Sequence, residues 1–255
     1  MELSIAIIVC KRDAAGTEKT VQSLFGLDAD IFLYDTSNED ISAQQAAKYN
    51  IRLCKGAWEG YEQVRFKAAM QAKHDWILML HTGEELDEKL RHSLQQLDYS
   101  NIRIAYRIGF INFFANKWLR HGAWGSYSPV RLANRGMVAV PGGRVNESIF
   151  SGQEIRIRKL KGHILHSSFR DRNGLAKKVI RDALLAAARY YREGRRVYLI
   201  NMIVSPVIAF LQNYFFKLGF LDGANGYICA RMGARYTFMK YARLRELKRT
   251  VRKRP

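Results

Sequence analysis

Residues Ser4-Ile5-Ala6-Ile7-Ile8-Val9 form an uninterrupted apolar run that decides the fold of this chain. The run is rich in β-branched residues and shows no polar alternation, which is typical of a parallel strand buried on both faces. Comparable runs follow, and helical stretches separate them: strands at Ile31–Tyr34, Ile51–Cys54 and Trp76–Leu80, helices at Thr20–Leu27, Gln44–Tyr49 and Tyr61–Ala72. This alternation predicts βαβ units and a mostly parallel sheet flanked by helices, an α/β fold.

The alternation weakens after Ala105–Ile111, and a Gly- and Arg-rich stretch runs on to Ser151. The last third, from about Leu175, has helical periodicity. No Pro- or Gly-rich linker divides the chain. We therefore predict an α/β domain over residues 1–172 and a helical, basic C-terminal region over residues 173–255.

The 255-residue chain has a formal net charge of +19, and the excess is uneven. Cations crowd the C-terminal end against the single acid Glu246: Arg231, Arg235, Lys240, Arg243, Arg245, Lys248, Arg249, Arg252, Lys253 and Arg254. Such an excess of positive charge indicates an anionic partner: nucleic acid, anionic lipid or a phosphorylated substrate.

The three cysteines and the N-terminus indicate a cytosolic protein. Cys10, Cys54 and Cys229 lie far apart and show neither metal-ligand spacing nor a disulfide framework, which suits a reducing compartment. Met1–Ser4 leads into the first apolar run without the basic start of a secretory signal peptide. We therefore expect the catalytic part to stay in the cytosol.

Two polar turns follow predicted strands, where parallel sheets bind ligands. Asp35 ends the second strand, and its carboxylate suits hydrogen bonds from a base or ribose; a helix N-cap or turn aspartate is the alternative. His81 and Glu84 follow the fourth strand, and they offer a nitrogen and oxygens to a divalent cation, Mg²⁺ or Mn²⁺. The alternative, which the residues alone favour, is that Glu84, Glu85, Asp87 and Glu88 form an acidic first helical turn.

The Gly- and Arg-rich stretch supplies further candidates for binding a sugar nucleotide. Trp124 offers an aromatic face to a sugar, and Arg120 and Arg131 offer guanidinium groups to phosphates. Glu147 is an acid among apolar and basic neighbours, and it is a candidate general base for an acceptor hydroxyl. A salt bridge to Arg144 or Arg131 is the alternative that the residues alone favour for Glu147.

The segment Val197–Phe216 has no charged residue and reaches the length of a membrane-spanning helix. Pro206 and several polar residues interrupt it, and Arg195, Arg196 and Lys217 flank it. This pattern favours helices that lie in the membrane interface over a helix that crosses it. No nucleic-acid fold signature accompanies the basic tail, so we rank nucleic-acid binding lower.

Several segments together resemble bacterial family 2 glycosyltransferases of the lipopolysaccharide-core glucosyltransferase type. The resemblance covers nearly the whole chain, and its motifs are Trp58–Tyr61, Tyr106–Ile108 with Asn112–Phe114, Arg120–Trp124, Val145–Glu147, Leu165–Asp171, and Gly219–Gly223 followed by Tyr236–Ala242. It implies a GT-A fold, a nucleoside-diphosphate sugar donor and inversion at the anomeric carbon. It also implies a glycolipid or lipopolysaccharide acceptor at the cytoplasmic side of the inner membrane, where the protein would be peripheral.

The resemblance also suggests roles for single residues. Asp35 matches the aspartate that such enzymes place near the nucleotide, and Glu147 matches the acid of their Val-His-Glu segment. Lys11 and Arg12 stand where Asn-Glu is usual, and the Asp-x-Asp metal motif aligns with His81-Thr82-Gly83, followed by Glu84. One interpretation is a metal-independent site in which Lys11, Arg12, Arg120 or Arg131 stabilises the diphosphate. The other is a catalytically degenerate member, a non-catalytic partner in envelope biosynthesis.

Overall fold

The computed structural model describes residues 2–10, 13–37, 40–115, 117–125, 127–137, 155–169 and 172–252, and the chain divides into two units. The first unit comprises residues 1–110 and 128–166, and the second comprises residues 111–127 and 167–255. The division predicted at residue 172 therefore leaves out one segment, residues 111–127. That segment groups with the C-terminal helices because Phe114 and Leu119 share an apolar core with Leu175 and Val179.

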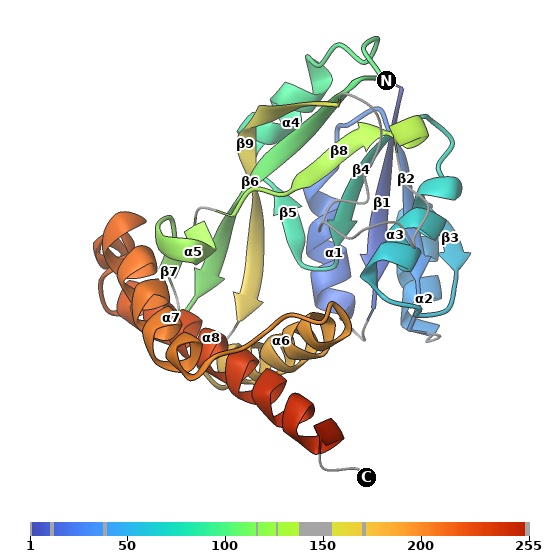
Figure 1. The fold of residues 1–255 in the computed structure, drawn as a ribbon. Coiled ribbons are helices and arrows are strands. Elements are labelled where there is room, and N and C mark those ends of the chain that lie inside the picture. The colour runs from blue at the N-terminus through green and yellow to red at the C-terminus, as the bar shows by residue number, and fades with distance from the viewer. Residues whose placement is uncertain are drawn as a thin grey trace. The chain divides into compact units, whose positions relative to one another are not determined.

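The parallel strands predicted from the apolar runs are present in the first unit. They are β1 (Leu3–Val9), β2 (Asp30–Asp35), β3 (Arg52–Lys55) and β4 (Trp76–His81). They pair in parallel in the order β3-β2-β1-β4, so the chain reverses its winding direction next to β1 (Figure 1). In sheets of this type the reversal point is where ligands bind, beyond the carboxyl ends of the strands.

Helices cover both faces of the parallel strands, which explains why the strand sequences do not alternate. They are α1 (Ala14–Ser23), α2 (Asp40–Tyr49) and α3 (Tyr61–Met70). Ile5, Ile7 and Val9 pack in one core with residues of α1 and α2, while Ala6 and Ile8 pack in another with residues of α3. Every residue of β1 is buried.

The remaining elements of the first unit are further strands of the sheet, a helix and a 3-10 turn. They are β5 (Glu84–Leu86), α4 (Glu88–Gln95), β6 (Ile104–Phe114), β8 (Val130–Asn134), the 3-10 turn η1 (Arg135–Met137) and β9 (Arg156–Phe169). β6 and β9 begin in the first unit and end in the second. The strand order continues from β4 through β8, β6 and β9 to β5.

The acidic segment after β4 is not the first turn of a helix, which the alternative interpretation expected of Glu84 and Glu85. Both residues lie in β5, where Glu84 pairs with His166 of β9. The helix begins only at Glu88, and the Asp87 carboxylate accepts a hydrogen bond from the Leu90 backbone N–H as its N-cap. The β5–β9 pairing therefore keeps Glu84 extended.

The second unit is mainly helical around a small apolar core. Its elements are β7 (Lys117–Leu119), α5 (Gly122–Gly125), α6 (Arg172–Arg192), α7 (Leu199–Leu211), the π-helix η2 (Gln212–Phe216), the 3-10 turn η3 (Gly219–Asp222) and α8 (Gly223–Arg252). β7 pairs with the end of β6. The segment Leu199–Phe216 is, within the described part of the chain, the one helix long and apolar enough to cross a membrane by length and composition.

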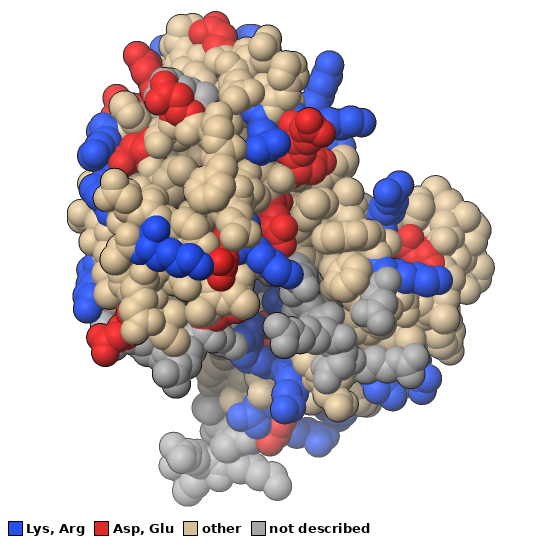
Figure 2. Space-filling model, turned by 180° about the vertical axis from the view of Figure 1, so that it is seen from behind, with Lys and Arg blue, Asp and Glu red and all other residues tan. Residues whose placement is uncertain are grey.

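One face of α7 and η2 is an exposed apolar stripe. Its residues recur at helical spacing and are 40–82% exposed: Leu199, Ile200, Ile203, Val204, Val207, Ile208, Leu211, Phe215 and Phe216. The opposite face packs on the protein, where Phe210 and Tyr214 contact the ring of Tyr227 in α8. The face drawn in Figure 2 shows uncharged areas with Lys and Arg as well as Asp and Glu between them. We call these nine residues the apolar stripe.

The packing of α4 against β9 yields a stability prediction at Gly162. This residue has φ +94°, and a Cβ atom there would lie 2.2 Å from the Leu90 backbone nitrogen. Gly162→Ala should therefore lower the free energy of unfolding by more than the ~1–2 kcal/mol of left-handed strain alone. Gly26 is the matched control, because it has φ +85° and nothing within 4 Å of its Cβ position. Urea unfolding that shows equal losses for Gly162→Ala and Gly26→Ala would contradict the predicted clash.

Candidate functional site

The carboxyl ends of β2 and β4 bring two of the predicted site residues to one edge of the sheet. Asp35 is in register with Val9 of β1, and His81 is in register with Ile8 on the other side of β1. Since neighbouring strands are about 4.8 Å apart, the two backbones are separated by about 10 Å across β1. The predicted placement of Asp35 and His81 at a common edge is therefore observed.

Asp35 is fully buried, and only one of its two carboxylate oxygens has a partner in the described residues. Oδ1 accepts hydrogen bonds from the Ser37 backbone N–H, at 2.7 Å, and from the Ser37 hydroxyl, at 2.6 Å. Oδ2 is buried without a hydrogen-bond partner. Asp35 is thus a turn aspartate through Oδ1, as the alternative expected, while Oδ2 stays available to a ligand. A buried acceptor left unsatisfied costs about 1–3 kcal/mol, which a donating ligand would recover.

Glu84 is buried, and donors within the protein occupy both of its oxygens. Oε2 accepts the backbone N–H of His81 at 2.9 Å, and Oε1 accepts Nη2 of Arg131 at 2.8 Å. A metal ion at Glu84 would have to compete with at least one of these donors. Within the described residues, no group of three or more His, Cys, Asp or Glu side chains is arranged to hold a metal ion.

Arg131 of β8 points into the protein, and its guanidinium is 5.0 Å from the ring centre of Phe110. Its residue is 5% exposed, and it also donates to the Met79 carbonyl at 3.4 Å. The Glu84 carboxylate accounts for this buried charge without a phosphate. Contact of Arg131 with a donor phosphate stays a prediction.

Arg65 is a residue at this edge that the sequence analysis did not single out. Its Nη2 lies 3.4 Å from Nε2 of His81, and the Tyr61 ring lies edge-on to the His81 ring at 6.0 Å. Both Arg65 and Tyr61 belong to α3, four residues apart and thus on one face of the helix. The sequence could have indicated these two residues, because they lie four positions apart in one predicted helix. The first turn of that helix follows β3, so it lies at the carboxyl edge of the sheet.

The protonation states of His81 and Glu84 follow from burial and the two arginines. Burial lowers the pKa of His81 to about 3; Glu84 opposes this shift, and Arg131 and Arg65 add to it. His81 is therefore neutral at physiological pH. Burial is the largest single influence and would raise the pKa of Glu84, but the Arg131 charge, His81, His166 and the hydrogen bond from the His81 backbone together outweigh it, and the net pKa lies below the ordinary value. Glu84 is therefore ionised.

Arg120 and Trp124 belong to the second unit. Arg120 is exposed, and Trp124 is half-buried against the core of that unit. Between them, the His121 imidazole Nδ1 lies 2.9 Å from the Asp222 carboxylate, which also accepts the backbone N–H of His121. Asp222 thus fixes the segment that contains Arg120.

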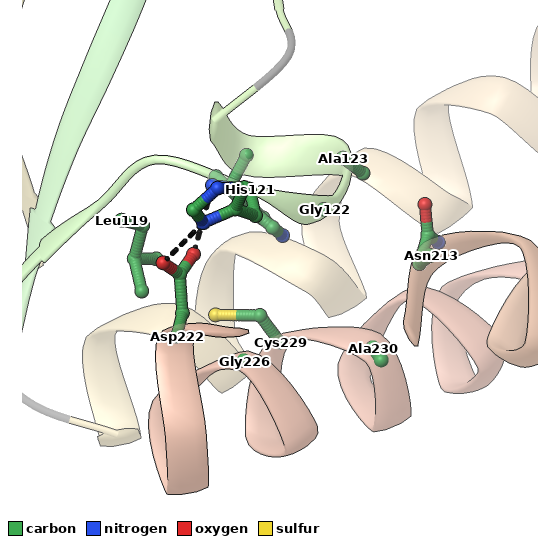
Figure 3. Close-up of a pocket in the computed structure, with 10 residues that line it drawn as sticks. Leu119, His121, Gly122, Ala123, Asn213, Asp222, Gly226, Cys229 and Ala230 are labelled. Atoms are coloured by element: carbon green, nitrogen blue, oxygen red, sulfur yellow. Dashed lines mark hydrogen bonds and ion pairs between the residues drawn. The ribbon is translucent and has the colours of Figure 1, made fainter. Parts of the chain in front are cut away.

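The pocket beside this His–Asp pair is small (Figure 3). His121, Asp222, Asn213 and Cys229 are among its lining residues, and its cavity volume is about 10 Å³. Small-molecule sites are usually ~300–1,000 Å³. The pocket is therefore too small for a nucleotide sugar.

A wider hollow, of about 520 Å³, opens in the first unit at the amino end of β2. Asp28 and Asp30 are the two acids that line it. Asp30 is paired with Arg52 at 2.7 Å and accepts hydrogen bonds from the Ser4 hydroxyl and the Lys73 backbone N–H. These partners satisfy the Asp30 carboxylate, which therefore differs from that of Asp35.

Three predicted site residues lie outside the described residues. They are Lys11 and Arg12, after β1, and the predicted base Glu147. Their roles stay predictions.

Comparisons with known proteins show that the chain is similar to glycosyltransferases. The chain is 26% identical to the lipopolysaccharide core biosynthesis glycosyltransferase LpsC of Rhizobium meliloti, over 94% of this chain and 90% of that protein. It is 21% identical to an uncharacterized glycosyltransferase of Rickettsia bellii, over 95% of this chain and 86% of that protein. No protein-family model matches the chain.

A solved structure shows the same fold. Glucosyl-3-phosphoglycerate synthase from Mycobacterium tuberculosis, crystallised with Mn²⁺, UDP and glucosyl-3-phosphoglycerate, superimposes with a TM-score of 0.50 at 12% identity. The match covers 76% of this chain and 80% of that one. The predicted GT-A fold, the resemblance to lipopolysaccharide-core glycosyltransferases and the enzyme class, glycosyltransferase, are thus confirmed.

The buried Glu84–Arg131 pair yields a prediction about stability. Arg131→Met should lower the free energy of unfolding at neutral pH by about 3–5 kcal/mol, because it leaves a buried carboxylate without its countercharge. Glu84→Leu combined with Arg131→Met should regain most of that loss. Arg135→Met is the control, since its pair with Asp75 is largely exposed and should contribute less than about 1 kcal/mol.

The same pair also gives a pH dependence. Because the folded-state pKa of Glu84 is lowered from 4.5, its contribution is complete at neutral pH and is lost as the pH falls through the lowered value. Urea unfolding between neutral and acidic pH should show this loss in the wild type and not in the double variant. A double variant as unstable as Arg131→Met would contradict the pairing.

Proposed function

We propose that this chain is an inverting glycosyltransferase that moves a hexose from a nucleoside-diphosphate sugar to a hydroxyl of a cell-envelope glycolipid or lipopolysaccharide-core acceptor. Its place would be the cytoplasmic face of the inner membrane of a bacterium. The observation that carries the proposal is the buried Asp35, whose Oδ2 lacks a protein partner at the carboxyl edge of a GT-A sheet. The similarity to LpsC, a lipopolysaccharide core biosynthesis glycosyltransferase, supports the acceptor class.

Asp35 would bind the nucleoside part of the donor. The Ser37 N–H and hydroxyl hold Oδ1, so the carboxylate cannot rotate freely and Oδ2 is fixed in place. A base N–H or a ribose hydroxyl that donates to Oδ2 would make a charge-assisted hydrogen bond. This contact would select a nucleotide donor over a free sugar phosphate.

The transfer itself is a single displacement. The acceptor oxygen forms a bond to the anomeric carbon while the bond from that carbon to the β-phosphate oxygen breaks. The electron pair leaves with the nucleoside diphosphate, and the configuration at the anomeric carbon is inverted. Glu147, the residue that the resemblance assigns as base, would take the proton of the acceptor hydroxyl.

The apolar stripe of the second unit would rest on the lipid surface. An exposed apolar surface of this kind marks an interaction site, and Arg195, Arg196 and Lys217 at its ends suit anionic head groups. The polar residues Asn201 and Ser205 lie among the half-buried positions, away from the stripe, whereas Gln212 is exposed beside Leu211. This separation is the pattern of a helix that lies in the interface.

Two variants test the donor and base assignments separately. Glu147→Gln should lower kcat by about 10²–10⁴-fold while the Kd for the donor stays unchanged, because the base acts on the acceptor. Asp35→Asn should instead weaken donor binding by about tenfold or more, because an amide nitrogen could replace the Oδ2 acceptor. Transfer from a panel of nucleotide sugars to membrane extract gives kcat, and titration calorimetry gives Kd.

Normal turnover of Glu147→Gln would refute the base assignment. A wild-type protein that binds a nucleotide sugar and transfers nothing would favour the alternative, a non-catalytic partner in envelope biosynthesis. Failure to bind any nucleotide sugar would refute the donor site.

Vesicle flotation tests the apolar stripe. The wild type should float with vesicles that contain anionic lipid, and Ile203→Glu with Phe216→Glu should abolish flotation because two charges would enter the lipid surface. Leu185→Glu is the control, since Leu185 is 59% exposed on α6, outside the stripe. If both variants float equally well, lipid binding by the apolar stripe is refuted. Binding to nucleic acid in place of vesicles would favour the alternative that the chain is a nucleic-acid-binding protein.

A further inference from the structure

The turn that joins α7 and η2 to α8 carries exposed apolar side chains of its own. Leu218, Phe220 and Leu221 are 43–56% exposed, and they closely follow Phe216, the last residue of the apolar stripe. We call these three residues the apolar tip. Single exposed apolar side chains are ordinary, whereas contiguous ones mark an interaction site. The exposed apolar surface therefore continues from the stripe into the turn.

The backbone of Leu218 is left-handed, with φ +56° and ψ +27°. This conformation is costly for a residue with a Cβ atom, and glycine is the usual residue where a helix ends in this way. Leu218 gains only part of what a core leucine gains from packing, since nearly half of its surface is exposed. Strain that internal contacts offset only in part points to a contact outside the chain.

Hydrogen bonds within the second unit fix the backbone of the turn. The Lys217 carbonyl accepts the Gly122 N–H at 2.8 Å, and the Leu218 N–H donates to the Phe215 carbonyl at 3.0 Å. The Leu218 carbonyl in turn accepts the Leu221 N–H at 3.0 Å. Backbone groups without partners are costly in hydrocarbon, so these bonds prepare the turn for contact with lipid. Because the turn is already ordered, binding does not have to order it.

The charges near the tip favour lipid over a second copy of this chain. Residues 197–230 contain two charged side chains, Lys217 and Asp222. The Asp222 carboxylate is largely buried and pairs with His121, whereas Lys217 is exposed. In a two-fold contact the same patch faces itself, which would bring two Lys217 ammonium groups together. At a bilayer surface the ammonium instead meets phosphates while the apolar side chains meet acyl chains.

We propose that the turn before α8 inserts into a lipid bilayer, with Leu218, Phe220 and Leu221 among the acyl chains and Lys217 at the level of the phosphates. Transfer of the Leu218 side chain into lipid then offsets its strained backbone. This proposal deepens the proposed function and rests on it, because it presupposes that the second unit contacts a membrane. It adds that the turn, and not the stripe alone, enters the lipid.

Leu218→Gly separates contact with lipid from packing within the protein. Glycine removes the side chain and relieves the strained backbone, so the urea midpoint of the full chain should be unchanged or higher. Binding to vesicles of phosphatidylcholine and phosphatidylglycerol in equal parts should weaken about three- to tenfold, because one half-exposed leucine leaves the lipid. A lower urea midpoint or unchanged vesicle binding would overturn the proposal.

Two further variants make this test specific. Asn50→Gly is the matched control, because Asn50 has a similar φ of +51° but belongs to the first unit, and it should leave vesicle binding unchanged. Leu221→Gln should weaken vesicle binding by about tenfold or more, since it places an amide in the lipid. Leu221→Gln decides the question if Leu218→Gly does not fold. Equal losses in Asn50→Gly and the tip variants would contradict the assignment.

Leu221→Trp tests insertion directly. Vesicles with brominated acyl chains should quench the emission that this variant adds to that of the four native tryptophans, which the wild type measures. A variant that floats with vesicles while its added emission is not quenched would refute insertion of the tip and leave the stripe standing. A wild type that does not float would refute both. Self-association of the wild type without vesicles, lost in Leu218→Gly, would assign the tip to a second copy and overturn the proposal.

Discussion

The parallel pairing of β1 with β2 on one side and β4 on the other is the constraint on which the candidate site depends. β1 is buried on both faces, so Ile5, Ile7 and Val9 belong to one apolar core and Ala6 and Ile8 to the other. A slip of one residue in either pairing would exchange the two sets of side chains between cores of different shape. The register is therefore fixed by packing, and it carries Asp35 and His81 to the same edge.

Charge balance explains why the buried Glu84 is stable at that edge of the sheet. A buried carboxylate requires a partner, and Arg131 supplies one positive charge for the one negative charge of Glu84. The motif that the resemblance implies would hold further acids at the positions of His81 and Gly83, and a single arginine could not balance them. Neutral residues at these two positions and a buried Arg131 therefore belong to one electrostatic arrangement.

The strands and their order of appearance were predictable because fully buried parallel strands leave long apolar runs. β5 was not predictable: Glu84-Glu85-Leu86 has no apolar run, and only its pairing with β9 makes it a strand. The grouping of residues 111–127 with the C-terminal helices also depends on distant contacts, those of Phe114 and Leu119. Likewise, Asp35 was found because it ends a strand, whereas Arg65 is recognised only when α3 is placed beside His81.

The contacts within the second unit favour the proposed contact with a membrane surface over a helix that crosses the membrane. A helix of 18 residues is about 27 Å long, slightly less than the ~30 Å hydrocarbon core of a bilayer. Length alone therefore does not distinguish a helix that crosses the membrane from a helix that lies at its surface. A helix that crosses lipid without partner helices would need an apolar surface on all sides. Here one face is the apolar stripe, while Asn201, Ser205 and Asn213 lie among the half-buried positions and Phe210 and Tyr214 pack on α8. Because α8 already covers that second face, the segment has a single face left for lipid.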